Sequence, residues 1–130
     1  MDNGIAGVAL GGNVEIIVHP YEYITSPIIN TDVPGGVYLT FWRFLNSDPT
    51  PNMANRVEAY NGRTWVVLFE SGGAPGVHDA VWTKFSYDLT PYKNANLQVR
   101  FGYTVETVTG TRKVSGWNLD DVEITNAVCP

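Results

Sequence analysis

Two adjacent carboxylates lie within the last strand-like segment of the chain, Gly116 to Thr125, and are the residues best suited to bind a charged ligand. Asp120 and Asp121 repel each other at neutral pH, so we expect a cation or an arginine to neutralise at least one of them. In a regular strand Asp121 and Glu123 share one face, whereas Asp120 points to the other. The two aspartates are therefore free to have different partners.

Calcium is one partner that the acidic pair suggests. The ion takes roughly six to eight oxygen ligands, and sandwich loops supply carbonyl and side-chain oxygens readily. Further ligands are expected from Asp2 and Asn3, or from Asp32, if the N-terminal segment lies beside the last strand. Calcium would then be a structural cofactor that stabilises loops, and no other cofactor is predicted.

An arginine is the alternative partner of Asp120. Arg43 and Arg100 lie in the middle of apolar, strand-like segments. An unpaired guanidinium is costly there, so an ion pair between Asp120 and one of these arginines is expected on physical grounds. Both arrangements can coexist, one aspartate binding the metal and the other the arginine.

Aromatic side chains form a second candidate site. Trp82 shares its predicted face of the segment Val81 to Leu89 with polar residues, so it is the tryptophan expected to be exposed, whereas the other three are expected in the core. Three tyrosines near predicted turns join it as candidate ligand-binding residues: Tyr21, Tyr23 and Tyr92. Flat rings beside carboxylates and amides suit stacking on sugars, which makes a glycan a possible partner.

Catalytic motifs are missing from the sequence. It contains no Gly-x-Ser-x-Gly, no His-Glu-x-x-His and no phosphate-binding loop, and adjacency of His78 and Asp79 does not make a triad. The chain is therefore not predicted to be an enzyme. A small hydrolase built from carboxylates that converge in space, such as Glu58, Glu70 and Asp88, is the alternative.

The composition narrows the classes of partner. Hydrophobic residues make up 44% of the 130 residues and charged ones 16%, which excludes a disordered or coiled-coil chain. The net charge is −5 and the eight basic residues are scattered, which argues against nucleic acid. No apolar run reaches the roughly 18 to 20 residues needed to cross a bilayer, so direct membrane insertion is not predicted.

Short strand-like segments separated by turns recur along the chain. Twelve per cent aromatic residues, thirteen glycines and eight prolines are typical of a β-sandwich. Val37 to Leu45 is the predicted central strand, Asn61-Gly62 predicts a hairpin, and Val14 to His19 predicts an edge strand able to pair outwards. The sequence therefore predicts an all-β fold, a two-sheet antiparallel jelly-roll β-sandwich of about eight strands.

One domain is expected over residues 1–130. Met1 to Gly12 is interpreted as a lead-in without the features of a signal peptide, and Ala127 to Pro130 as the start of a tail or linker. The lone Cys129 is either an inert thiol or the partner of a cysteine further along a longer protein.

Six short motifs, in order, resemble the MAM-like jelly-roll modules of bacterial secreted and surface proteins. They are Ser26 to Ile29, Val37 to Trp42, Asn61-Gly62 with Trp65, Trp82 to Thr90, Val99 to Phe101, and Trp117 to Val122. Animal MAM domains contain disulfides and this chain has no internal cysteine pair, so the resemblance is to the disulfide-free bacterial relatives.

The resemblance implies a non-catalytic binding or adhesion module that is secreted or displayed at the cell surface. Its implied partners are a glycan or protein at that surface, together with other domains of the same polypeptide. A structural subunit that assembles into a surface layer or filament is the alternative, and a carbohydrate-binding module is a second one.

Overall fold

The computed structural model describes residues 5–7, 17–107, 114 and 116–126. The described part consists of strands joined by loops and one short 3-10 helix, and no helix in it is long and apolar enough to cross a membrane. In chain order the elements are β1 (Ile5–Gly7), β2 (His19–Thr25), β3 (Tyr38–Ser47), β4 (Met53–Tyr60), β5 (Trp65–Glu70), β6 (Val77–His78), β7 (Thr83–Asp88), η1 (Thr90–Tyr92), β8 (Val99–Val105) and β9 (Gly116–Thr125).

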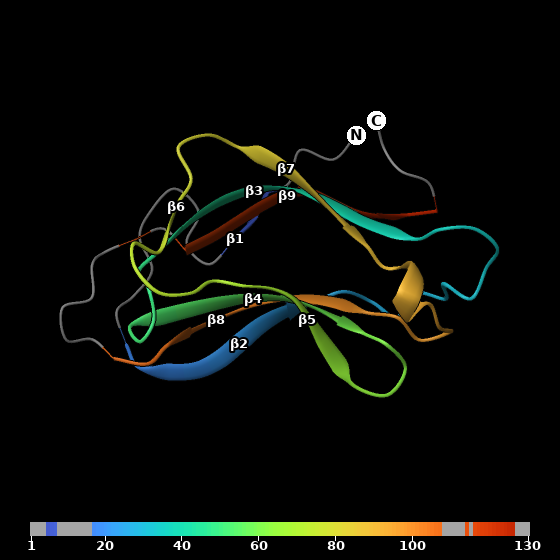
Figure 1. Ribbon diagram of the computed structural model, residues 1–130, viewed down its shortest axis with the longest axis horizontal. Helices are drawn as coiled ribbons and strands as arrows, with labels where there is room; N and C mark the ends of the chain where they lie inside the picture. Colours follow the sequence, from blue (N-terminus) through green and yellow to red (C-terminus); the bar gives the residue numbers. More distant parts are fainter. Residues whose placement is uncertain (1–4, 8–16, 108–113, 115, 127–130) are drawn as a thin grey trace.

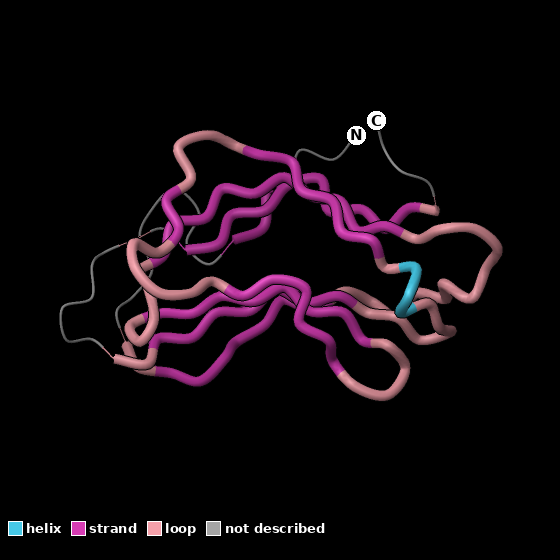
Figure 2. Tube along the Cα trace, in the orientation of Figure 1, coloured by secondary structure: helices cyan, strands magenta, loops and turns pink. Residues whose placement is uncertain are grey.

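The strands form two antiparallel sheets packed face to face (Figures 1 and 2). One sheet has the order β1-β9-β3, with β6 and β7 both pairing with the far side of β3, and the other has the order β2-β8-β4-β5. Chain neighbours mostly lie in opposite sheets, and only β4 and β5 are joined as a hairpin within one sheet. This order is that of a jelly roll, so the predicted fold is confirmed.

Strand β3 is the centre of the five-stranded sheet, between β9 and β7. Alternate residues point between the sheets, and Leu39, Phe41 and Leu45 are almost completely buried there. From the opposite sheet, Val57 and Phe101 pack in the same cluster. The segment predicted as the central strand therefore has strand partners on both edges, and its inner face is in the core.

The predicted Asn61-Gly62 hairpin joins β4 and β5. Gly62 has a φ of +94°, a conformation that a side chain disfavours. The Asn61 side-chain oxygen accepts hydrogen bonds of 2.9 Å from the backbone N–H groups of Arg63 and Thr64. Asn61 therefore closes the turn with its own side chain, which is why this dipeptide marks the hairpin so clearly.

The N-terminal expectations need correction. Of the predicted edge strand Val14 to His19, Ile17 and Val18 form no strand, His19 is the first residue of β2, and residues 14–16 lie outside the described part. Instead β2 begins at His19 and includes Pro20, which an edge strand tolerates because one side of it makes no ladder hydrogen bonds. The expected lead-in contributes a strand, β1, whereas Cys129 and the predicted tail lie outside the described residues.

Aromatic rings cross the outer face of the four-stranded sheet directly above a glycine. Tyr23 on β2 is the cross-strand neighbour of Gly102 on β8, and its ring stacks on that of Tyr21 at 5.7 Å. A Cβ atom at position 102 would lie 2.4 Å from a ring carbon of Tyr23. The absence of a side chain on Gly102 therefore allows the ring to lie flat on the sheet.

We predict that Gly102→Ala destabilises the protein by about 1–3 kcal/mol, because the added methyl must displace the Tyr23 ring or the backbone beneath it. Urea unfolding followed by tryptophan fluorescence would measure the change. Gly72→Ala is the matched control, since a Cβ there meets no atom within 4 Å. Equal stability of the two variants would show that the close approach of Tyr23 has no energetic consequence.

Candidate functional site

A β-bulge places the acidic pair on the outer face of the five-stranded sheet. Thr40 of β3 lies opposite Glu123 and Trp42 lies opposite Asp120, so Asp121 and Val122 together face the single residue between them. Asp121 has a φ of +46°, a conformation that aspartate tolerates better than most residues. Its backbone N–H donates a 2.8 Å hydrogen bond to Oδ1 of Asp120.

The bulge overturns the face assignment expected of a regular strand. Asp120 and Glu123 lie opposite Trp42 and Thr40, which belong to the same outer face of β3. They therefore share a face, whereas strict alternation predicted opposite faces. One extra residue in a strand shifts the alternation of every later residue, which explains the difference.

Two tryptophans complete a pocket around the aspartates. Trp42, Trp82, Asp120 and Asp121 line an open cavity of about 370 Å³. The tryptophans are 37% and 39% exposed, and Trp82 also contacts Phe44, with ring centroids 5.9 Å apart. Trp82 immediately precedes β7, whose residue Lys84 pairs with Trp42, so adjacent strands bring the two rings together. The expectation that Trp82 is exposed is confirmed.

The aspartates of this pocket have no cationic partner among the described residues. The described ion pairs are Arg43–Asp79, Arg56–Glu70 and Arg100–Glu58. The expected pairing of Asp120 with Arg43 or Arg100 is therefore wrong. Both arginines do have a carboxylate partner, which compensates the cost of burying their charge, but Asp79 and Glu58 supply it.

Arg43 points between the sheets and binds Asp79 through two nitrogens, at 2.9 Å each. One oxygen of Asp79 also accepts a 2.8 Å hydrogen bond from the backbone N–H of Leu45. The guanidinium lies 4.1 Å from the ring centroid of Phe85 and 5.4 Å from that of Phe69. Hydrogen bonds and aromatic faces thus compensate a charge that is largely removed from water.

Arg100 belongs to the outer face of the four-stranded sheet. Its guanidinium lies between two rings, 3.8 Å from the centroid of Tyr23 and 3.9 Å from that of Trp65, and its Nε donates to Glu58 at 2.7 Å. Arg56 lies over Tyr21 in the same way, 4.5 Å from its centroid. Burial raises the pKa of Tyr21 to about 12, although Arg56 opposes the shift.

The predicted ligand-binding aromatics are not brought together. Tyr21 and Tyr23 lie on the outer face of the four-stranded sheet, occupied with the arginines, whereas Trp82 is on the opposite sheet. Tyr92, in η1, is partly buried and packs against the main core. Of the predicted set, Trp82 lines the pocket with the aspartates, while the tyrosines have structural contacts elsewhere.

Of the predicted calcium ligands, the structure can place Asp32 relative to the aspartate pair. No group of three or more His, Cys, Asp or Glu residues suited to a metal occurs within the described ranges, so Asp32 does not join the aspartate pair. Strand β1 does run beside Asp120, as the calcium hypothesis requires of the N-terminal segment, with Ile5 as its register partner. Asp2 and Asn3 themselves lie outside the described residues.

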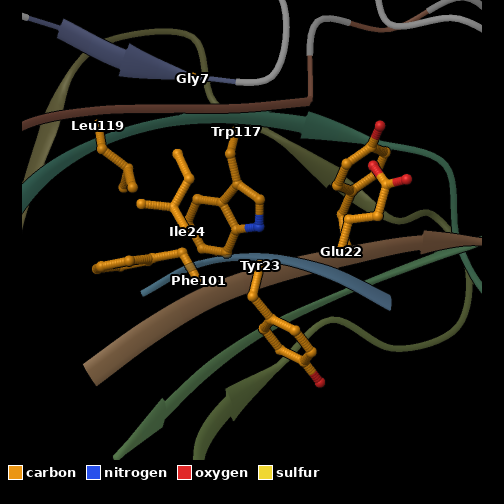
Figure 3. A pocket seen from close by; sticks show the side chains of 8 residues that line it. Gly7, Glu22, Tyr23, Ile24, Phe101, Trp117 and Leu119 are labelled. Atoms are coloured by element: carbon orange, nitrogen blue, oxygen red, sulfur yellow. The ribbon is translucent and has the colours of Figure 1, made fainter. Parts of the chain in front are cut away.

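A second opening lies between the sheets, where β1 and β9 approach β2 and β8 (Figure 3). Its volume is about 270 Å³. Ile24, Phe101, Trp117 and Leu119 make its lining largely apolar, and Glu22 supplies a carboxylate. The Trp117 indole N–H already donates a 2.9 Å hydrogen bond to the Gly102 carbonyl. This opening therefore suits an apolar ligand better than a polar one.

Comparison with known proteins identifies no family. No family model matches the chain, and no curated protein matches it. Among solved structures, it is similar to the K3 cleaved adhesin domain of Lys-gingipain from Porphyromonas gingivalis w83. The identity is 21%, the match covers 93% of this chain and 71% of that chain, and the TM-score is 0.49.

Sequence reasoning missed Trp42 as a site residue, because it lies in the most apolar segment and was assigned to the core. A signal was present in the alternation. Trp42 is in phase with the polar Thr40 and out of phase with the buried Phe41. The partner of Arg43 had no such signal, because Asp79 lies in a loop and is placed only by the pairing of β6 with the end of β3.

We predict that Asp79→Ala destabilises the protein by about 3–5 kcal/mol, because the Arg43 side chain, 11% exposed, would lose its partner. Glu70→Ala breaks the exposed pair with Arg56, in which the Glu70 side chain is 45% exposed, and should reduce the free energy of unfolding by less than about 1 kcal/mol. Urea unfolding of both variants checks the difference. Losses of the same size would contradict a special role of the buried pair.

Proposed function

We propose that this chain is a non-catalytic binding module of a secreted or cell-surface protein and that it binds its partner through the Trp42–Trp82–Asp120–Asp121 pocket. One observation carries the proposal. Two half-exposed tryptophans and two carboxylates without a cationic partner among the described residues line one open cavity.

The exposure of the tryptophans supports a binding role. Large aromatic rings on an accessible surface, next to charged groups, are typical of residues that dominate binding energy in protein interfaces. Neither ring is needed to fill the core, where Leu39, Phe41 and Leu45 occupy the other face of the same strand. The stability of the sandwich thus gives no evident reason for two tryptophans at this place.

A binding role also suits the chemistry of the pocket better than catalysis. Glycoside hydrolysis uses two carboxyl groups that flank the bond to be cleaved. Asp120 and Asp121 are neighbours on one strand, and the other described residues that line the pocket are tryptophans, which neither transfer protons nor attack substrates. The resemblance of the motifs to MAM-like modules supports the extracellular location and the attachment to other domains.

Carbohydrate is the second candidate ligand, and the same pocket favours it. Tryptophan faces can stack on the C–H faces of a sugar ring, and carboxylate oxygens can accept hydrogen bonds from its hydroxyl groups.

A structural calcium at Asp120 and Asp121 stays a prediction. Since a ligand of the native state raises its stability, equal melting temperatures in calcium and in chelator would contradict it.

We predict that Trp82→Ala lowers retention of the protein on its partner at least about tenfold, as expected of a central aromatic contact. Surface-immobilised polysaccharides and extracellular proteins, screened against the purified chain by biolayer interferometry, provide the measurement. Val81→Ala is the matched control, because Val81 is 68% exposed and adjacent but does not line the pocket. Retention that survives Trp82→Ala would move the binding site elsewhere.

A further inference from the structure

We propose that the group held in the Trp42–Trp82–Asp120–Asp121 pocket is an organic cation, the side chain of an arginine or lysine exposed on a partner protein. The inference rests on the proposed function and names the ligand class of that same site. Three observations support it: the charge of the pocket, its two tryptophan rings, and the small number of oxygen ligands that it offers a metal.

Charge is the first argument. Among the described residues the salt bridges leave Asp120 and Asp121 without a basic partner, and Lys84, the basic residue nearest by register, is separated from Asp120 by Trp42 on the intervening strand. A neutral ligand that covers the pocket would remove two carboxylates from water without neutralising either, which is unfavourable. A cation removes that penalty and also relieves the repulsion between the two aspartates.

The tryptophans are the second argument. An ammonium or guanidinium group is attracted to the face of an indole ring, and tryptophan is the best aromatic residue for this contact. The protein already uses the arrangement in its own structure. Arg43 lies 4.1 Å from the Phe85 centroid while Asp79 binds it, and Arg100 lies between Tyr23 and Trp65 while Glu58 binds it.

The pocket has the same combination of partners, without a cation among the residues that the structure describes. Each of these two arginines has a carboxylate and at least one aromatic face, and the pocket offers two carboxylates and two indole rings. A metal ion is less well served. Calcium needs roughly six to eight oxygens, whereas indole rings supply none and the described residues contain no group of three acidic or histidine ligands.

NMR titration of the purified chain tests the inference. The indole N–H signals of Trp42 and Trp82 are followed while one of three compounds is added. Two are the Nα-acetyl amides of arginine and lysine, whose side chains are cationic. The third is the Nα-acetyl amide of citrulline, a neutral isostere of arginine. We expect the two cationic amides to shift these signals and the citrulline compound to bind at least about fivefold more weakly. Raising the salt concentration from about 0.01 M to about 1 M should weaken the binding of the cationic compounds but not that of the citrulline compound. The reason is that it shortens the screening length of charge–charge interactions from about 30 Å to about 3 Å.

The double variant Asp120→Asn/Asp121→Asn removes the charge with little change of structure. An asparagine oxygen at position 120 can still accept the hydrogen bond from residue 121, and asparagine tolerates the positive φ of that position. We expect about tenfold weaker binding of acetyl-arginine amide. Asp32→Asn/Glu106→Gln is the charge-matched control, since both residues are exposed and neither lines the pocket.

The remaining outcomes separate this inference from the proposed function. Equal binding of the arginine and citrulline compounds, or no shift with either cationic amide, overturns the cationic ligand. If glycans then bind with the same dependence on Trp82 and no dependence on salt, the module still binds through this pocket, and only the ligand class is wrong. If calcium chloride shifts the signals and the double variant abolishes that shift while the amides have no effect, the pocket is a metal site. Retention unaffected by Trp82→Ala overturns the proposed binding through this pocket and moves the site elsewhere.

Discussion

The pairing of β3 with β9 in the middle of the five-stranded sheet determines where most of the other features lie. On the inner face of β3, alternate residues form the centre of the core, and Arg43, which is in phase with them, points between the sheets. On its other side, the register with β9 brings Asp120 opposite Trp42. The candidate site therefore depends on the β3–β9 ladder, whereas the partner of Arg43 is placed by the pairing of β6 with the other edge of the same strand.

Cations within this sandwich are compensated in a consistent way. Arg43 and Arg100 each have one carboxylate and two aromatic rings as close neighbours, although one arginine lies between the sheets and the other on an outer face. An aromatic face attracts a cation without taking a proton or adding a competing charge, so it complements the carboxylate. The outer pocket differs from these two sites. It has carboxylates and aromatic rings, but no cation among the described residues lies between them.

The bulge in β9 shows how a single residue can decide the composition of a surface. Without Asp121 in its positive φ conformation, the alternation along β9 would continue unbroken, and the residues after it would exchange faces. With it, Ile124 packs against the core opposite Leu39, while Asp120 and Glu123 are on the outside. The conformation that aspartate tolerates here thus serves the core and the acidic surface at once.

Four features could be predicted from the residues alone, because each depends on the alternation or turn preference of neighbouring residues: the fold class, the central strand, the Asn61-Gly62 hairpin and the exposure of Trp82. The need of Arg43 and Arg100 for acidic partners was also predictable, since their neighbours are apolar. The identity of those partners, Asp79 and Glu58, came from the folded structure, as did the pairing of Trp42 with Trp82 and the aspartates. Strand order and register set those distances, and a bulge of one residue changes the register in a way that local patterns do not encode.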